Sequence, residues 1–111
     1  MDPLIDEHEI IRRVLRPYAD VRYAYDDLHN ETVFDDESAR YLIMSHGWMD
    51  GRRAHGCLIH VEILDGKIWI QRDGTEDGVA DEMVEAGIPK SRIVLGFWDP
   101  EARKLGEFAA A

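Results

Sequence analysis

The segment from residue 56 to residue 97 constrains the fold more tightly than any other part of the chain. It follows the order strand, two-residue turn, strand, capped helix and strand, with almost no residues left between these elements. Alternation of apolar and polar residues indicates a strand, whereas an apolar stripe at helical spacing indicates a helix. The close succession of the two patterns predicts a compact α+β fold.

Two Asp-Gly pairs predict tight turns in the middle of the chain. Asp50-Gly51 and Asp65-Gly66 are both flanked by β-prone residues, and this dipeptide favours the type I′ turn of a two-residue hairpin. The runs 32–34 and 41–46, which precede the first turn, are also β-prone. Together these signals predict an antiparallel meander.

Type I′ turns at these two places would also fix which residues face each other. Counting back from the first turn pairs Leu42 with Ile59, and counting from the second pairs His60 with Gln71. Both registers put one apolar set on the same side, which we expect to be the core face. The set is Leu42, Met44, Cys57, Ile59, Val61, Ile63, Ile68 and Ile70.

The second face of the meander is the candidate binding site. In the expected registers it carries aromatic, polar and aliphatic side chains together, a mixture typical of the core of a protein interface. One layer of helices covers only one face of a sheet. The alternative is that the N-terminal helix covers this face and that the histidine there is a hydrogen-bonded structural residue. The predicted interface residues are Tyr41, Ile43, Leu58, His60, Trp69 and Gln71.

Two main helices should flank the meander. Asp2-Pro3 resembles an N-cap followed by proline at the first helical position, and Pro17 should end or kink this first helix near the residue before it. Thr75 is an expected N-cap for a second helix over about 76–86, which Gly87 should stop. The apolar stripe of the second helix should lie over the core face of the sheet.

The end of the chain predicts one more strand and a tail. Residues 93–95 read as a short buried strand, for which a parallel crossover is one option. Residues 99–101 should open a final turn, and Phe108 should anchor the tail. We therefore expect one α+β domain over residues 1–111, an antiparallel β-meander packed with two main helices, a short C-terminal strand and a tail.

Charge and composition narrow the functional classes. The formal charge of −10 would repel a phosphate backbone, so no direct nucleic-acid binding is expected. No run approaches the roughly 20 apolar residues of a membrane helix, and the first residues are not a basic signal peptide. The expected protein is cytoplasmic and has no membrane partner.

No catalytic residue, cofactor site or metal site is expected. The single cysteine, Cys57, lies in an apolar run and should be a small buried hydrophobe. His46 and His55 should pair across the first hairpin, but with Cys57 they supply only three ligands, one of them assigned to the core. A group of acidic residues should be solvated loop positions, because no nucleophile or phosphate-binding loop accompanies it. The group is Asp26, Asp27, Asp35, Asp36 and Glu37.

A long, ordered set of residues matches the pattern of a known family. The residues are Thr32, 34–35, Tyr41, 47–48, 51–53, Gly56, 59–60, 65–71, 73–76, 87–89 and 94–97. On this set nearly the whole sequence resembles the XisI family, which is named for a controlling factor in excision of the fdxN DNA element of cyanobacteria. The tail differs at 98–100 and 105–106, and Pro17 is unusual within the first helix.

The resemblance implies a small accessory factor that acts with a XisH-like partner, itself similar to nuclease-fold proteins, to permit excision by a recombinase. It implies no catalytic residue. The acidic balance suits a protein partner, either the XisH-like protein or a second copy that forms a homodimer. Two alternatives remain: an immunity or antitoxin-like neutraliser of a nuclease-fold partner, and a small metal-dependent enzyme that uses His46 and His55.

Overall fold

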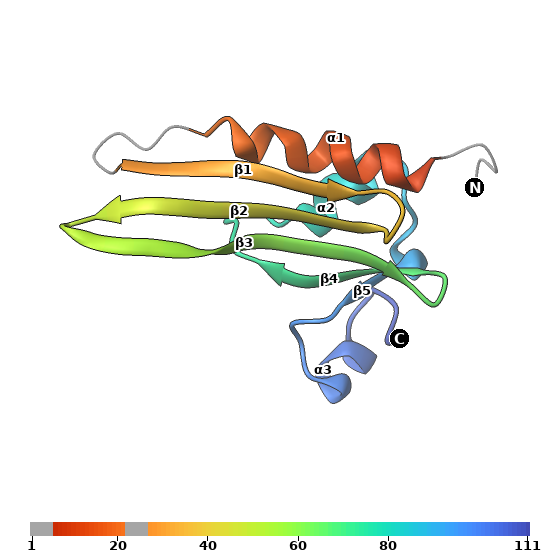
Figure 1. The fold of residues 1–111 in the computed structure, drawn as a ribbon. Helices are drawn as coiled ribbons and strands as arrows, with labels where there is room; N and C mark the ends of the chain where they lie inside the picture. The colour runs from red at the N-terminus through yellow and green to blue at the C-terminus, as the bar shows by residue number, and fades with distance from the viewer. Residues whose placement is uncertain (1–5, 22–26) are drawn as a thin grey trace.

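The computed structural model describes residues 6–21 and 27–111, which form one five-stranded sheet with helices (Figure 1). The strands follow chain order across the sheet, and β4 and β5 are parallel whereas all other neighbours are antiparallel. This confirms the predicted α+β meander. The strands are β1 (Asp27–Asp35), β2 (Arg40–Met49), β3 (Arg52–Leu64), β4 (Lys67–Asp73) and β5 (Ile93–Leu95), and the helices are α1 (Glu7–Ala19), α2 (Val79–Glu85), the 3₁₀ helix η1 (Lys90–Arg92) and α3 (Pro100–Leu105).

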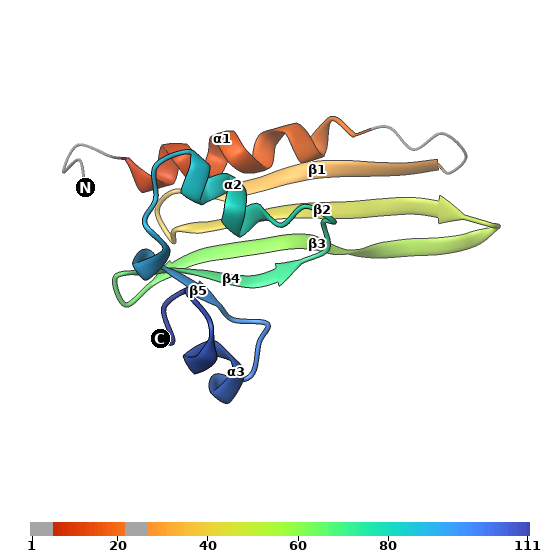
Figure 2. The same cartoon turned by 180° about the vertical axis from the view of Figure 1, so that it is seen from behind.

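Helices α1 and α2 share one face of the sheet. Helix α2 lies behind the sheet in Figure 1 and in front of it in the reversed view of Figure 2, and α1 contacts β1, β2 and α2. Helix α3 lies apart from them, beyond β5. We call the side of the sheet that faces α1 and α2 the inner face and the opposite side the outer face.

Both predicted tight turns are present. Asp50 and Gly51 have φ angles of 51° and 76°, and Asp65 and Gly66 have φ angles of 51° and 78°. Positive φ at both central residues is the requirement of a type I′ turn, which Asp-Gly meets at little steric cost. Close to the turns the pairing is as predicted, since Met49 pairs with Arg52 and Leu64 with Lys67.

Two bulges in β3 and β4 change the pairing further from the turns. Met44 still pairs with Cys57, but Ile43 pairs with Ile59, so Leu58 is an extra residue on β3. The second shift lies between β3 residues His60 and Val61 and makes His60 pair with Arg72 instead of Gln71. The predicted pairs Leu42–Ile59 and His60–Gln71 are therefore wrong, because each bulge inserts one residue and reverses the faces beyond it.

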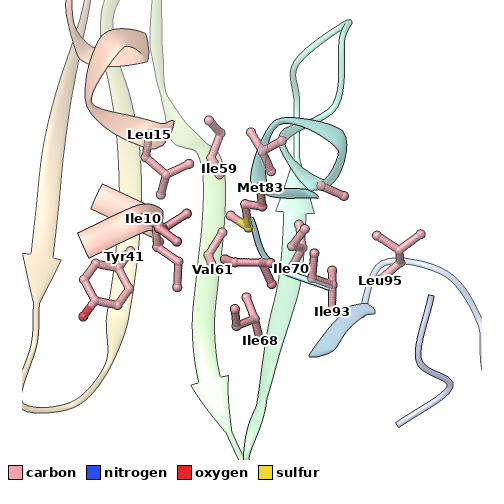
Figure 3. Packing of buried hydrophobic residues seen from close by; sticks show 14 of the residues in the cluster. Ile10, Leu15, Tyr41, Ile59, Val61, Ile68, Ile70, Met83, Ile93 and Leu95 are labelled. Atoms are coloured by element: carbon pink, nitrogen blue, oxygen red, sulfur yellow. The ribbon is translucent and has the colours of Figure 1, made fainter. Parts of the chain in front are cut away.

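The core therefore keeps only part of the predicted set. Leu42, Met44 and Cys57 lie on the outer face, and Tyr41 and Ile43 take their places in the interior. Figure 3 shows side chains from the sheet meeting those of α1 and α2. The side chains that are completely buried are Ile11, Leu15, Tyr41, Ile43, Ile59, Val61, Ile68, Ile70, Val79, Met83, Ile93 and Val94.

Helix α1 differs from the prediction at its C-terminal end. The predicted cap at residues 2–3 lies outside the described residues, and in the structure the Asp6 side chain accepts a hydrogen bond from the Glu9 amide. Pro17 lies inside the helix, which continues to Ala19. The final turn persists because Tyr18 packs on the core and donates a hydrogen bond to Glu82 of α2 at 3.0 Å.

Helix α2 begins later than predicted. Thr75 is not the N-cap of α2, which is Gly78. The Thr75 hydroxyl accepts a hydrogen bond from the Gly78 amide, and the Asp73 carboxylate accepts one from the Val79 amide at 2.9 Å. Gly78 has a φ of 85°, which is incompatible with an earlier helical start. The predicted stop at Gly87 is confirmed, with a φ of 115° and the two backbone hydrogen bonds of a Schellman motif.

The last segment also follows the prediction. Strand β5 is buried and parallel to β4, and Asp99 caps α3 by accepting a hydrogen bond from the Ala102 amide. Phe108 packs against the core, and Ala109 forms a bridge with Val94. No helix in the described residues is long and apolar enough to cross a membrane.

Candidate functional site

The outer face is built from cross-strand rows of side chains. Residues that pair across antiparallel strands point to the same side, so successive pairs alternate between the two faces of the sheet. In the part of the chain that the structure describes, no helix covers this face over β1, β2 and β3 (Figure 1). From the β2–β3 turn inward, the outer rows are Asp27–Trp48–Arg53, His29–His46–His55, Glu31–Met44–Cys57, Val33–Leu42–His60 and Asp35–Arg40–Glu62–Trp69.

Three of the six predicted interface residues do not lie on this face. Tyr41 and Ile43 are completely buried on the inner face, and the bulge residue Leu58 is partly buried against the core. The prediction that all six side chains share one exposed face is wrong, because the bulge at Leu58 exchanges the two faces of β2 relative to β3. The other three, His60, Trp69 and Gln71, are on the outer face, and their role in binding stays a prediction.

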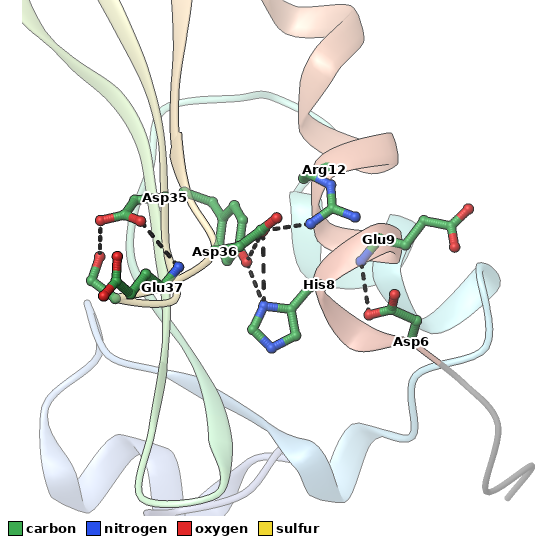
Figure 4. A network of polar contacts seen from close by, with 9 residues as sticks. Asp6, His8, Glu9, Arg12, Asp35, Asp36 and Glu37 are labelled. Atoms are coloured by element: carbon green, nitrogen blue, oxygen red, sulfur yellow. Dashed lines mark hydrogen bonds and ion pairs between the residues drawn. The ribbon is translucent and has the colours of Figure 1, made fainter.

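Tyr41 instead belongs to a polar network between the sheet and α1. Figure 4 shows the network around Asp36, with His8 and Arg12 of α1. The Tyr41 hydroxyl donates a hydrogen bond to Asp36 at 2.6 Å. Because its proton is used in that bond, the hydroxyl oxygen accepts a hydrogen bond from Nδ1 of His8 at 2.5 Å. Arg12 donates to the same oxygen of Asp36 at 2.5 Å. The network ties the β1–β2 turn to the first turns of α1.

The network changes the acidity of its members. The hydrogen bond from Tyr41 is the main cause that lowers the pKa of Asp36, and Arg12 adds to the effect. Burial, followed by the hydrogen bond to Asp36, raises the pKa of Tyr41. These shifts favour the neutral phenol and the charged carboxylate.

The acidic residues singled out in the sequence are thereby mostly explained. Asp26 lies outside the described residues. Asp35 accepts hydrogen bonds from the Ser38 hydroxyl at 2.8 Å and the Glu37 amide at 3.0 Å, and these bonds lower its pKa. Asp27 is hydrogen-bonded to His29, with 3.0 Å between Oδ1 and Nε2. Asp35 thus takes part in turn formation and Asp27 in a local side-chain contact.

The outer row farthest from the β2–β3 turn holds a fixed carboxylate. Glu62 accepts hydrogen bonds from Arg40 at 3.3 Å and from Gln71 at 3.0 Å, and its side chain is only 16% exposed. In the adjacent row, Nε2 of His60 is buried and has no hydrogen-bond partner. Water is thus already excluded from part of this face, although no helix covers it.

Two aromatic side chains on the outer face are stacked with arginines. The guanidinium of Arg53 lies 5.8 Å from the centre of the Trp48 ring, and that of Arg103 lies 5.3 Å from the centre of the Trp69 ring. Trp48 is 51% exposed, close to the β2–β3 turn. Tryptophan and arginine are the residues most enriched among those that dominate binding energy in protein interfaces.

The predicted pairing of His46 with His55 is confirmed, and His29 continues the row on β1. Sequence reasoning missed His29 because the stretch before residue 31 shows no clear period. Cys57 belongs to the outer face, and burial raises the pKa of its thiol. Within residues 6–21 and 27–111, no group of three His, Cys, Asp or Glu side chains could hold a metal ion.

Comparison with known proteins identifies the family. The sequence model described as XisI protein matches residues 1–110. The chain belongs to the XisI family. A comparison with curated proteins found no match.

Two solved structures resemble this XisI-family chain over almost its whole length. A XisI-like protein from Anabaena variabilis ATCC 29413 is 34% identical, with a TM-score of 0.84 and coverage of 94% of this chain and 95% of that one. The fdxN element excision controlling factor XisI from the same organism is 32% identical, with a TM-score of 0.76 and coverage of 96% and 100%. The resemblance inferred from the sequence is confirmed.

The XisI match includes the tail that differs at residues 98–100 and 105–106. In the structure this part forms α3, whose Arg103 reaches Trp69 and also donates a hydrogen bond to the Ala110 carbonyl. The tail therefore borders the outer face at its β4 end, where it covers part of Trp69.

Proposed function

We propose that this chain is a non-catalytic accessory protein in the control of excision of a DNA element, and that it works by binding protein. Membership of the XisI family and the name of one solved relative, an excision controlling factor, support this role. The observation that carries the binding mode is the outer face, where Val33, Leu42 and Met44 present apolar groups that no helix of the described chain covers.

The hetero-partner that we propose is a XisH-like protein. A partner similar to nuclease-fold proteins would handle the DNA, whereas this chain, with a formal charge of −10, is suited to protein contact and not to the phosphate backbone. In this role the chain binds no nucleic acid, membrane or cofactor, and it acts in the cytoplasm, where a chromosomal element would be excised.

Capture of the XisH-like protein by the tagged full chain tests the proposal. We expect the wild type to retain this partner. Val33→Arg should reduce capture about tenfold, because Val33 is 48% exposed on the outer face of the edge strand β1 and a charge there would be desolvated on binding. Leu105→Arg is the matched control, since Leu105 is 90% exposed on α3 and belongs to none of the outer rows over β1, β2 and β3.

The wild type and the Val33→Arg variant test different parts of the proposal, the partner and the binding surface. No capture by the wild type would overturn the XisH-like partner. Undiminished capture by Val33→Arg, with normal capture by Leu105→Arg, would overturn the outer face as the protein-binding surface.

A further inference from the structure

We propose that a second copy of this chain occupies the outer face, related to the first by a two-fold axis that crosses the strands over Met44 and Cys57. This inference rests on the proposed function in one respect, because it takes the outer face to be a protein-binding surface and names its occupant. The XisH-like protein would then recognise the dimer, so Val33→Arg would weaken its capture by weakening the dimer.

The charge distribution favours a second copy. The outer rows, together with Lys67 and Arg72 at the β4 end, carry as many basic as acidic side chains, so the formal charge of the face sums to zero although the chain carries −10. The acidic excess lies elsewhere, mainly on the helices and turns. Two copies can therefore pack by their outer faces and keep their negative surfaces turned apart. The basic residues are Arg40, Arg53, Lys67 and Arg72, and the acidic ones are Asp27, Glu31, Asp35 and Glu62.

The order of the rows brings opposite charges together on β3 when the face meets a second copy of itself, whereas on the edge strand β1 the exposed Asp27 comes opposite the exposed Asp35. A two-fold axis over the Met44–Cys57 row exchanges rows at equal distances on either side of it. The row of Trp48 and Arg53 then meets the row of Arg40 and Glu62 from the second copy, and the reverse contact forms at the other end. Each dimer contains the Arg53–Glu62 contact twice.

The side chains in these two rows are already held in place. Glu62 is fixed by its hydrogen bonds from Arg40 and Gln71, and Arg53 is stacked on Trp48. Long side chains from both copies can meet across the roughly 10 Å that separates packed sheets. Because little side-chain freedom remains to be lost, these contacts are pre-organised for binding.

The size of the face is sufficient for a dimer. Four strands spaced about 4.8 Å apart and about 33 Å long present roughly 600 Å² per copy, or roughly 1,200 Å² in total, which is the lower end of stable interfaces. Aligned packing of two twisted sheets is also the arrangement of a β-sandwich. The dimer would give β1, β2 and β3 the second layer that they lack in a single copy.

Sedimentation velocity over a range of concentrations tests the proposal. We expect the wild type to dimerise, and Arg53→Glu or Glu62→Arg alone to raise the dimer dissociation constant about 100-fold, because each reverses two contacts per dimer. Arg13→Glu, the same charge change at an exposed residue of α1, should dimerise like the wild type. A circular dichroism spectrum and a melting curve for each variant check that it folds.

The decisive arm mixes the two defective variants. In a dimer of one Arg53→Glu chain and one Glu62→Arg chain, both cross-contacts again join opposite charges, so the mixture should dimerise although neither variant does so alone. Failure of the mixture to recover, or a wild type that is monomeric at every concentration, would overturn the inference.

Labelling of Cys57 reports the location of the contact. It is the only cysteine of the chain and lies at the proposed axis, so a small maleimide should label the wild-type dimer more slowly than monomeric Arg53→Glu. Equal labelling rates would overturn this placement.

A monomeric wild type that still captures the XisH-like protein would leave the proposed function intact, whereas a dimer through this face that captures nothing would refute the hetero-partner alone.

Discussion

Gly47 of β2 lies so close to Asp27 of β1 that a Cβ atom on Gly47 would be 1.8 Å from the Asp27 carbonyl oxygen. Gly47 also has a φ of 147°, a backbone conformation that L-residues with side chains rarely adopt. Close approach of the two strands therefore depends on the missing side chain at this position.

Gly47→Ala should lower the free energy of unfolding by about 3 kcal/mol, because the methyl group meets backbone and the φ angle is strained. Thermal melting measures the loss. Gly56→Ala is the matched control on β3, where a Cβ would meet no atom within 4 Å and the φ angle is ordinary, and it should melt near the wild type. Similar melting of both variants would contradict the close contact.

Asp73→Ala should destabilise the protein by about 2 kcal/mol, as measured by urea unfolding. The carboxylate accepts hydrogen bonds from the Thr75 amide, the Thr75 hydroxyl and the Val79 amide, and it therefore holds the turn that starts α2. Asp77→Ala, a change at an exposed residue of the same turn, should have little effect. An equal loss in both variants would show that general charge, and not this cap, stabilises the turn.

Tyr18 should make stability depend on alkaline pH. Burial, followed by the hydrogen bond to Glu82, raises the pKa of Tyr18 from its ordinary 10.0 to about 12. The folded state thus favours the neutral phenol, and its contribution is complete below pH 10 and disappears as the pH rises toward about 12.

Comparison with Tyr18→Phe measures this contribution. At neutral pH the variant should be about 1 kcal/mol less stable, because it lacks the hydrogen bond to Glu82. The difference should shrink as the pH rises, since only the wild type loses this bond. Tyr41 also has a raised pKa, but it is present in both proteins. A constant difference across this range would refute the assignment.

Arg92→Lys should not be a neutral exchange. The guanidinium donates from Nε and Nη2 to the two carboxylate oxygens of Glu7, at 3.0 and 2.7 Å, a geometry that an ammonium group cannot reproduce. We expect a loss of about 1 kcal/mol in chemical denaturation. Lys104→Ala removes an exposed ion pair with Glu101 and should cost less than about 0.5 kcal/mol. An unchanged stability in Arg92→Lys would show that the paired geometry contributes nothing.

The sequence predicted the turns and helices better than it predicted the faces of the sheet. The Asp-Gly turns and the end of α2 at Gly87 depend on the backbone preferences of a few neighbouring residues, so a short stretch of sequence is enough to predict them. Faces depend on register over a whole strand, and one inserted residue changes them. Both Leu58 and Ile59 are apolar, so alternation could not show that Leu58 is a bulge.

The same cause limited the prediction of the binding site. His60, Trp69 and Gln71 were placed on the outer face correctly. Trp69 lies near the second turn, where the register is as predicted, and His60 and Gln71 lie two residues from the outward-facing pair Glu62 and Trp69. Tyr41 and Ile43 lie beyond the bulge and were placed on the wrong side. Their exchange brought Leu42 and Met44 to the surface, which no local signal in the apolar run 41–44 could have indicated.

The Glu7–Arg92 contact joins residues that are 85 positions apart. During synthesis on the ribosome, each of the strands β2 to β4 can pair with the strand before it as soon as it has been made, because neighbours in the sheet are also neighbours along the chain. Helix α1 precedes the strands along the chain, yet its contact with Arg92 can form only after all of β1 to β4 have been synthesised. The ion pair between Glu7 and Arg92 can therefore hold α1 in place only after the strands beneath the helix have been made.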